Sequence, residues 1–107
     1  MADLYGCMTD KMFDVLATTS IAKWWNSQSD LVKEYGHINA SEIYTTWKCK
    51  AIENFKGLFG VPRDGDGLYF EFTYHAAKNQ CYLDVYKKQT QVVVPFVVQS
   101  TTYPKSA

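Results

Sequence analysis

The sequence predicts a single α+β domain, because helical periodicity dominates its first third and strand alternation dominates its last third. Its 107 residues suit one domain, and 47% hydrophobic and 16% aromatic residues are enough for a packed core. The 11 basic and 11 acidic residues balance, so no charge excess favours nucleic acid or an anionic membrane as a partner. The composition therefore favours a globular protein whose surface meets other proteins.

The first third has the periodicity of helix. Thr9 or Asp10 can cap a turn that carries an apolar group. This group is Met12, Val15 and Leu16. From position 20 onward, apolar residues recur every three or four positions, and Gly36 is suited to end the helix. The polar run NSQS at 26–29 offers an alternative, in which this stretch is divided into two helices.

Residues 39–59 fit two structures. Asn39 and Glu42 match a capping box. Apolar residues then recur every four positions, as on a helix, at Ile43, Trp47, Ala51, Phe55 and Phe59. The same stretch also alternates as a strand does, and Thr45 and Thr46 favour strand. Periodicity alone leaves helix and strand open here.

The last third predicts strands. Residues 68–74 place Leu68, Phe70, Phe72 and Tyr74 on one face and Tyr69, Glu71 and Thr73 on the other. A loose connection leads to a second strand, CYLDVY at 81–86. The run QVVVPFVVQ at 91–99 can form a third, which Pro95 would confine to a sheet edge. We place a domain at 1–88 and a C-terminal extension at 89–107, partly strand and then frayed.

The sequence predicts no catalytic residue, metal or cofactor. The Asp-Gly-Asp-Gly run at 64–67 fits no register of a calcium-binding EF-hand loop and predicts a turn. His37 and His75 lack metal-ligand spacing with any cysteine. The three cysteines are odd in number and far apart, which indicates a reducing cytosol. No apolar run approaches membrane-spanning length.

Four segments in order resemble the small dynein light chain family. They are MTDKM at 8–12, TTWKC at 45–49, NFKG at 54–57 and LYFEFTY at 68–74. The family carries Thr-Trp-His-Cys, then Asn-Phe-Gly, then an aromatic alternating strand. The resemblance spans residues 8–88 and implies two helices packed on a four- to five-stranded antiparallel sheet, in a strand-exchanged dimer. It also implies that residues 46–52 form a strand.

The resemblance implies a non-enzymatic, dimeric protein-binding hub in the cytoplasm or on the cytoskeleton. Extended segments of partner proteins, such as the dynein intermediate chain, would bind by adding a strand to the exchanged strand's edge. The implied binding groove consists of Gly57, Leu58, Phe59, Val61, Tyr69, Glu71 and Thr73. The implied dimer interface includes Trp47, Lys48 and Phe55.

The sequence departs from the family pattern. Lys48 replaces the family's histidine, so we expect no dimer dissociation with a midpoint near neutral pH. Pro62 and Arg63 follow the implied exchanged strand, and Glu71 and Thr73 replace aromatic groove residues, which would weaken or redirect peptide binding. Such divergence resembles the light-chain-like domains attached to EF-hand pairs in flatworm calcium-binding proteins, where calcium would belong to another domain.

Two other functions stay open. One is a small inhibitor or immunity-type protein that blocks a partner enzyme with a preformed surface. The other is a small enzyme with a cysteine nucleophile at Cys49 or Cys81, paired with a histidine that only the fold could bring close.

Overall fold

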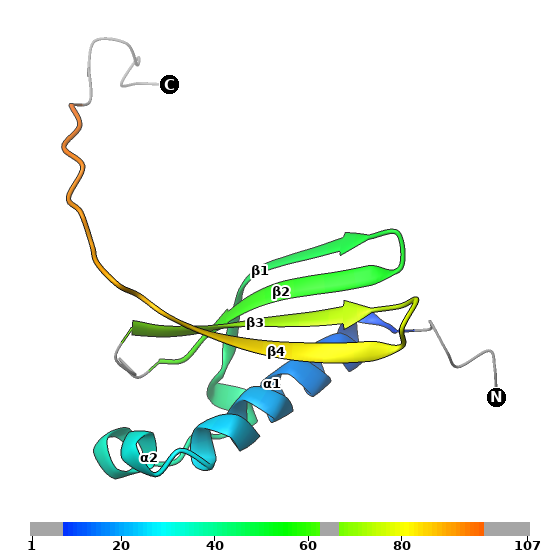
Figure 1. The fold of residues 1–107 in the computed structure, drawn as a ribbon, viewed down its shortest axis with the longest axis horizontal. Helices are drawn as coiled ribbons and strands as arrows, with labels where there is room; N and C mark the ends of the chain where they lie inside the picture. Colours follow the sequence, from blue (N-terminus) through cyan, green and yellow to red (C-terminus); the bar gives the residue numbers. More distant parts are fainter. Residues whose placement is uncertain (1–7, 63–66, 98–107) are drawn as a thin grey trace, which may run out of the picture.

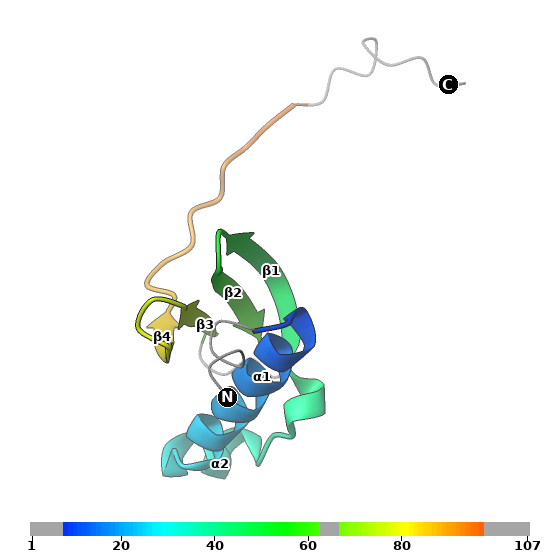
Figure 2. The same cartoon turned by 90° about the vertical axis from the view of Figure 1, so that its right-hand side faces the viewer.

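The computed structural model describes residues 8–62 and 67–97, and within them the chain is an α+β unit. The elements in order are α1 (Asp10–Asn26), α2 (Ser29–Tyr35), the 3₁₀ turn η2 (Ala40–Glu42), β1 (Tyr44–Ala51), β2 (Asn54–Gly60), β3 (Leu68–His75) and β4 (Gln80–Lys87). The strands form one antiparallel sheet in the order β1-β2-β3-β4. Helix α1 runs along one face of this sheet, and α2 lies beyond its C-terminal end (Figures 1 and 2). The predicted fold class is confirmed, with four strands.

Helix α1 begins at a side-chain cap and ends in the predicted polar run. The hydroxyl of Thr9 accepts a hydrogen bond from the Met12 backbone N–H at 3.1 Å, which satisfies a donor of the first turn. The helix ends at Asn26, and α2 ends where Gly36 adopts a φ of 83°. The division into two helices is therefore confirmed. In the described ranges, no helix is long and apolar enough to cross a membrane.

The face of α1 that packs on the sheet is not the apolar group expected near its start. The buried positions are Phe13, Ala17, Ile21, Ala22 and Trp25. Met12, Val15 and Leu16 are exposed instead. The buried stripe of this continuous helix starts at Phe13 and recurs at helical spacing, so these three residues lie outside it.

The return from the helices to the sheet is held by the end of α1. The Asn26 amide donates to the Ile38 carbonyl and its oxygen accepts from the Ile38 N–H, both at 2.9 Å. The Trp25 indole donates to the Gly36 carbonyl at 2.9 Å. The predicted capping box is present at η2, where the Asn39 N–H donates to the Glu42 carboxylate.

The helical alternative for residues 43–59 is wrong. The capping box supports only the single turn η2, and residues 44–51 and 54–60 form the hairpin β1–β2. The four-residue spacing arises from two strands: Phe55 and Phe59 of β2 are buried, while Trp47 and Ala51 of β1 are exposed. The strand expected at residues 46–52 therefore lies within this hairpin. A β-bulge between Thr45 and Trp47 interrupts the pairing of β1 with β2.

Alternation in β2 and β3 creates the core under α1. Phe55 and Phe59 of β2 and Phe70, Phe72 and Tyr74 of β3 are all buried. The centroid of the Phe13 ring lies 5.3 Å from that of Phe55, 6.2 Å from that of Phe59 and 5.6 Å from that of Phe72. The buried face predicted for residues 68–74 is confirmed in β3, apart from Leu68, which is only partly buried.

After β4 the chain leaves the sheet, and the strand predicted at 91–99 is wrong for the described residues 91–97. The Lys88 N–H still donates to the Gly67 carbonyl at 3.0 Å, and Gly67 has a φ of 74°. Residues 91–97 then form no strand and lie exposed. Asp64 and Asp66 of the predicted turn lie outside the described residues.

Replacing Gly57 is expected to destabilise the fold, because an added methyl group would enter the aromatic core. A Cβ there would lie 2.9 Å from Phe59 and 3.2 Å from Phe13. Gly57→Ala should lower the free energy of unfolding by about 1–3 kcal/mol through overpacking, measured by urea denaturation. Gly60→Ala is the comparison, since its Cβ would meet the half-exposed Tyr44 ring, which can swing outward. Equal losses at both glycines would contradict this account.

Ile52, at the tip of the β1–β2 hairpin, is expected to store backbone strain. It is β-branched, 92% exposed and has a φ of 59°. Ile52→Asn should raise the free energy of unfolding by about 1 kcal/mol, because asparagine tolerates the left-handed region. Ile52→Val, which keeps the branched Cβ, should give no gain. A thermal melt of both variants checks this, and equal stabilities would count against strain at this position.

Candidate functional site

The sheet face turned away from α1 carries a row of half-exposed aromatic side chains. We call this surface the open face; strand register places on it Trp47 and Cys49 of β1, Lys56 and Leu58 of β2, Tyr69, Glu71 and Thr73 of β3, and Tyr82, Asp84 and Tyr86 of β4. Tyr44 joins them by lying over Gly60. The five aromatic residues of the open face are between 39% and 50% exposed. So many large rings on one solvent-facing sheet surface are typical of a binding surface.

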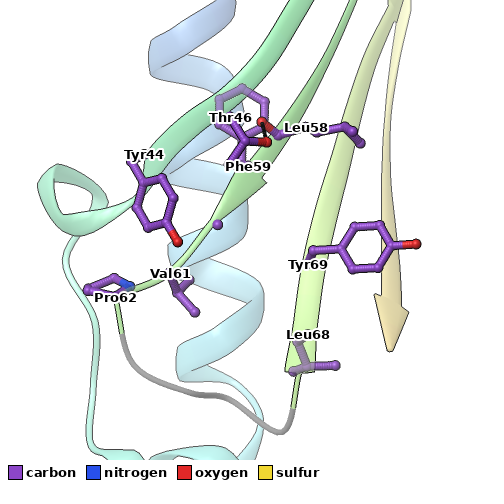
Figure 3. A pocket seen from close by; sticks show the side chains of 9 residues that line it. Tyr44, Thr46, Leu58, Phe59, Val61, Pro62, Leu68 and Tyr69 are labelled. Carbon is purple, nitrogen blue, oxygen red and sulfur yellow. Dashed lines mark hydrogen bonds between the residues drawn. The ribbon is translucent and has the colours of Figure 1, made fainter. Parts of the chain in front are cut away.

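The first of two hollows on the open face lies where β1 begins and β2 ends (Figure 3). We call it the Tyr44 hollow; it measures about 410 Å³. Its lining includes Tyr44 and Thr46 of β1, Leu58 of β2, and Leu68 and Tyr69 of β3. The bulge in β1 brings Thr46 into this lining, and the Thr46 hydroxyl donates to the Leu58 carbonyl at 3.0 Å.

The second hollow lies toward the hairpin turn of β1 and β2. We call it the Trp47 hollow; it measures about 300 Å³. Its lining includes Trp47, Cys49 and Ala51 of β1, Lys56 of β2, and Thr73 and His75 of β3. The two hollows follow β1 along its length, so an extended segment beside β1 would pass both.

The fold brings Cys49 and His75 to one hollow, but no hydrogen bond joins them. The His75 Nδ1 accepts instead from the Lys78 N–H at 3.3 Å. Burial raises the pKa of the Cys81 thiol, which makes this cysteine a weaker nucleophile at neutral pH. In the described part of the chain, no group of three or more histidine, cysteine or acidic residues could hold a metal ion.

An acidic pair lies in the middle of the open face. Glu71 and Asp84 are directly opposite each other on β3 and β4, an arrangement that is unfavourable for like charges. Glu71 accepts a hydrogen bond from the Tyr86 hydroxyl at 3.3 Å and lies 3.7 Å from the Lys56 ammonium. The Glu71 charge is the main cause that raises the pKa of Tyr86, and burial and the Asp84 charge raise it further.

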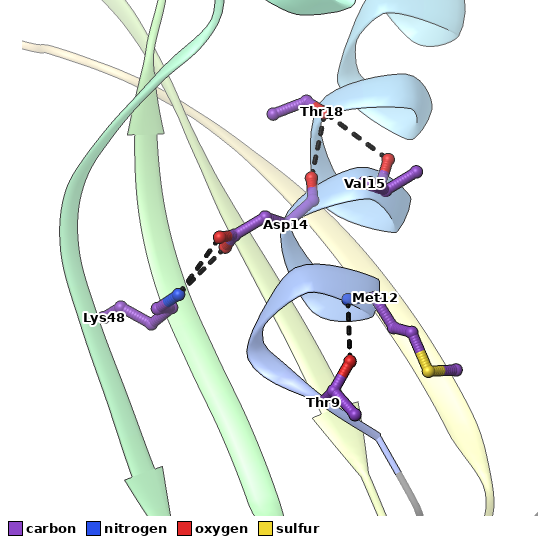
Figure 4. A network of polar contacts seen from close by, with 6 residues as sticks. All are labelled: Thr9, Met12, Asp14, Val15, Thr18 and Lys48. Atoms are coloured by element: carbon purple, nitrogen blue, oxygen red, sulfur yellow. Dashed lines mark hydrogen bonds and ion pairs between the residues drawn. The ribbon is translucent and has the colours of Figure 1, made fainter.

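The outer edge of β1 is free of a neighbouring strand in the described structure. Its Lys48 side chain turns toward α1 and binds both carboxylate oxygens of Asp14, at 3.0 and 3.2 Å (Figure 4). This ion pair is partly exposed, so it contributes no more than about 1 kcal/mol. It ties β1 to the helix while the opposite face of the strand stays open.

The predicted groove residues divide between the two faces of the sheet. Leu58, Tyr69, Glu71 and Thr73 lie on the open face. Gly57 and Phe59 lie on the sheet face that packs against α1, and Val61 is buried. The resemblance implies that residues 57–61 are exchanged between copies, but β2, which contains residues 57–60, pairs on both sides within its own chain.

The predicted interface residues also divide. Trp47 is half-exposed on the open face, and Lys48 is paired with Asp14. Phe55 is only 2% exposed and stacks on Phe13, so the structure places it in the core of the single chain.

Sequence reasoning missed Tyr44, Tyr82, Asp84 and Tyr86. The alternation within CYLDVY was a usable signal for the three residues of β4. Tyr44 carries no such signal, because its place over Gly60 follows from the pairing of β1 with β2.

Comparison with known families places the chain in a group defined by sequence. The family model described as a family of unknown function, DUF6275, matches residues 15–96. The chain belongs to the DUF6275 family. No curated protein and no solved structure matches it. The match to DUF6275 includes α1 from Val15 onward, α2, the whole sheet and the chain after β4 up to Phe96.

The Tyr86 phenol is expected to ionise above its ordinary pKa of 10.0 because of Glu71. Since the raised pKa belongs to the folded state, its contribution to stability is complete below pH 10.0 and is lost as the pH rises through the raised value. Glu71→Gln should therefore move this ionisation to lower pH.

The measurement is the phenolate absorbance of each protein minus that of its Tyr86→Phe counterpart. Glu53→Gln, which removes the same charge at the hairpin turn, should leave the Tyr86 titration unchanged. An unaltered titration in Glu71→Gln would show that Glu71 does not govern it.

Proposed function

We propose that this DUF6275 protein is a non-enzymatic protein-binding module. It takes an extended segment of a partner along the outer edge of β1, with alternate side chains of that segment entering the Tyr44 and Trp47 hollows. The single observation that carries the proposal is that β1, whose outer edge is free in the described structure, contributes residues to both hollows of the aromatic open face. Backbone hydrogen bonds would supply affinity, and the hollows would supply selectivity.

The other sheet edge fits this role less well. Strand β4 is also an edge, but it contributes no residue to either hollow. Its own open-face residues are engaged with one another and with β3. Tyr86 stacks on Tyr69 with ring centroids 5.1 Å apart, and the Tyr82 hydroxyl donates to Gln80 at 2.6 Å.

The chemistry of the hollows favours an apolar segment with one polar position. The Trp47 hollow is lined mainly by apolar atoms, among them those of the Trp47 indole and the Ala51 methyl group. The Tyr44 hollow offers the Tyr44 hydroxyl and the Thr46 hydroxyl, which donates to the Leu58 carbonyl, besides its apolar wall (Figure 3). A partner segment would therefore place an apolar side chain at the hairpin end of β1 and a group able to form hydrogen bonds at the other.

The resemblance to small dynein light chains implies the same physical mode, in which a partner segment adds a strand to a sheet. The module proposed here differs in where that strand is added. It uses the edge of β1, and it needs no exchange of β2, which is already paired on both sides.

Heptapeptides selected from a random display library on the full chain are expected to perturb the amide signals of β1 in NMR spectra. N-methylation of alternate peptide nitrogens should weaken binding at least about tenfold, because each lost backbone hydrogen bond costs on the order of 1 kcal/mol. Trp47→Ala should weaken it to a similar extent, since this half-exposed ring forms the wall of one hollow.

Tyr82→Ala is the matched control, because it removes an open-face ring of similar exposure from β4 and should leave the affinity unchanged. Binding that spares β1, or that tolerates N-methylation, would overturn strand addition at this edge.

A further inference from the structure

The chain after β4 carries an apolar segment that nothing in the described structure covers. We call residues 91–97, QVVVPFV, the C-terminal arm. Its apolar side chains other than Pro95 are between 74% and 88% exposed. These side chains are Val92, Val93, Val94, Phe96 and Val97. Such a run in water indicates a surface that is covered in the working protein.

We propose that the arm of one copy pairs along the β1 edge of a second copy, so that two chains form a dimer by exchanging arms. The proposal rests on the function proposed above, because it assigns a natural occupant to the same edge. By symmetry each copy would give one arm and receive one, as in a two-fold dimer.

The dimensions of the arm match this edge. At about 3.3 Å per residue, the seven residues of the arm extend about 23 Å, and the eight residues of β1 extend about 26 Å. The arm is already without helix or turn, so pairing requires little rearrangement of its backbone.

The position of Pro95 also fits an added outer strand. In a strand, successive N–H groups point to opposite sides, so Val92, Val94 and Phe96 can all face β1. Pro95, which has no N–H, then faces outward, where no donor is needed. The side chains of the three inward-pairing residues also share one face of the strand.

Chain length places the arm on a second copy rather than on its own β1. Lys88 is held beside Gly67 by a backbone hydrogen bond, at the end of β4. From Lys88 to Val92 the chain spans at most about 14 Å. A strand outside β1 lies four strand spacings from β4, or about 19 Å. The arm therefore cannot reach that edge in its own chain along its full length.

Three further observations fit this pairing with a second copy. The arm departs on the side of the sheet opposite α1, so it leaves toward the open face rather than toward the helix (Figures 1 and 2). The DUF6275 match continues to Phe96, so nearly the whole arm belongs to the sequence shared with the family. The formal net charge of zero means that two copies do not repel each other.

The first test is the molar mass of the full chain by light scattering across a dilution series. The wild type should have twice the mass of 12.3 kDa and dissociate on dilution. The double substitution Val94→Asp with Phe96→Asp should raise the dissociation constant at least about 100-fold, because it places charges where apolar contacts form. Both residues are exposed, so the single chain should still fold.

Val15→Asp is the matched control. It puts the same charge at an exposed apolar residue of α1, next to Met12 and Leu16, and should leave the dimer intact. A wild type that is monomeric at every concentration would overturn the proposal, as would a dimer that survives the arm substitutions. Loss of the dimer in Val15→Asp alone would assign the interface to the α1 surface instead.

The second test locates the arm. Cys49 of β1 is exposed in the Trp47 hollow, and Cys81 lies on β4 away from both hollows. Alkylation followed by peptide mass analysis should show Cys49 protected in the wild type and several-fold more reactive in the arm variant, with Cys81 unchanged. Equal Cys49 reactivity in the two proteins would place the arm elsewhere and overturn the assignment to β1.

Pairing of the arm with β1 and binding of partner segments to β1 can be rejected independently of each other. The monomeric arm variant still has a free β1 edge, so selected heptapeptides should bind it more tightly than they bind the wild type. Peptide binding by a monomeric wild type would retain the function and reject the arm as occupant. A dimer that depends on the arm, with no peptide bound to β1 in the arm variant, would retain the arm and reject a wider binding role.

Discussion

The contact of Phe13 with three rings of the sheet is the interaction on which the rest of the structure depends. Phe13 is completely buried, and its ring lies within 5.3–6.2 Å of Phe55, Phe59 and Phe72. Gly57 leaves the space that this ring occupies. The contact fixes α1 across β2 and β3 and thereby decides which face of each strand is core. Every side chain of opposite parity on these strands is then directed away from the helix.

The described residues contain one long helix, α1, and it covers one face of the sheet (Figure 2). The open face is consequently exposed for lack of a second layer, and its rings stay between 39% and 50% exposed. Its centre is held by polar contacts among Glu71, Lys56 and Tyr86, which partly offset the unfavourable pairing of Glu71 with Asp84. Near β1 no such network is present among the described residues, and the two hollows occur there.

The two edges of the sheet have different surroundings. Strand β1 is bulged and tied to the helix through Lys48 and Asp14, features that limit uncontrolled pairing at an edge without closing it. Strand β4 passes directly into Lys88 and the exposed apolar arm. A free edge bordered by hollows and an exposed apolar segment thus occur in one small chain. Mutual coverage between copies would remove both exposed features at once, whereas the arm cannot reach the β1 edge of its own chain along its full length.

The sequence by itself determined the fold class, a helix cap at Thr9 or Asp10, the end of α2 at Gly36, the capping box at η2 and the two faces of β3. Each of these depends on residues close together in the chain, where periodicity and capping chemistry act directly. Only the tertiary structure decided that residues 44–60 are a hairpin, that Phe55 is core, and that residues 91–97 stay unpaired. It alone also placed Tyr44 over Gly60 and Glu71 opposite Asp84, because register between strands is set by packing against α1 rather than by local sequence.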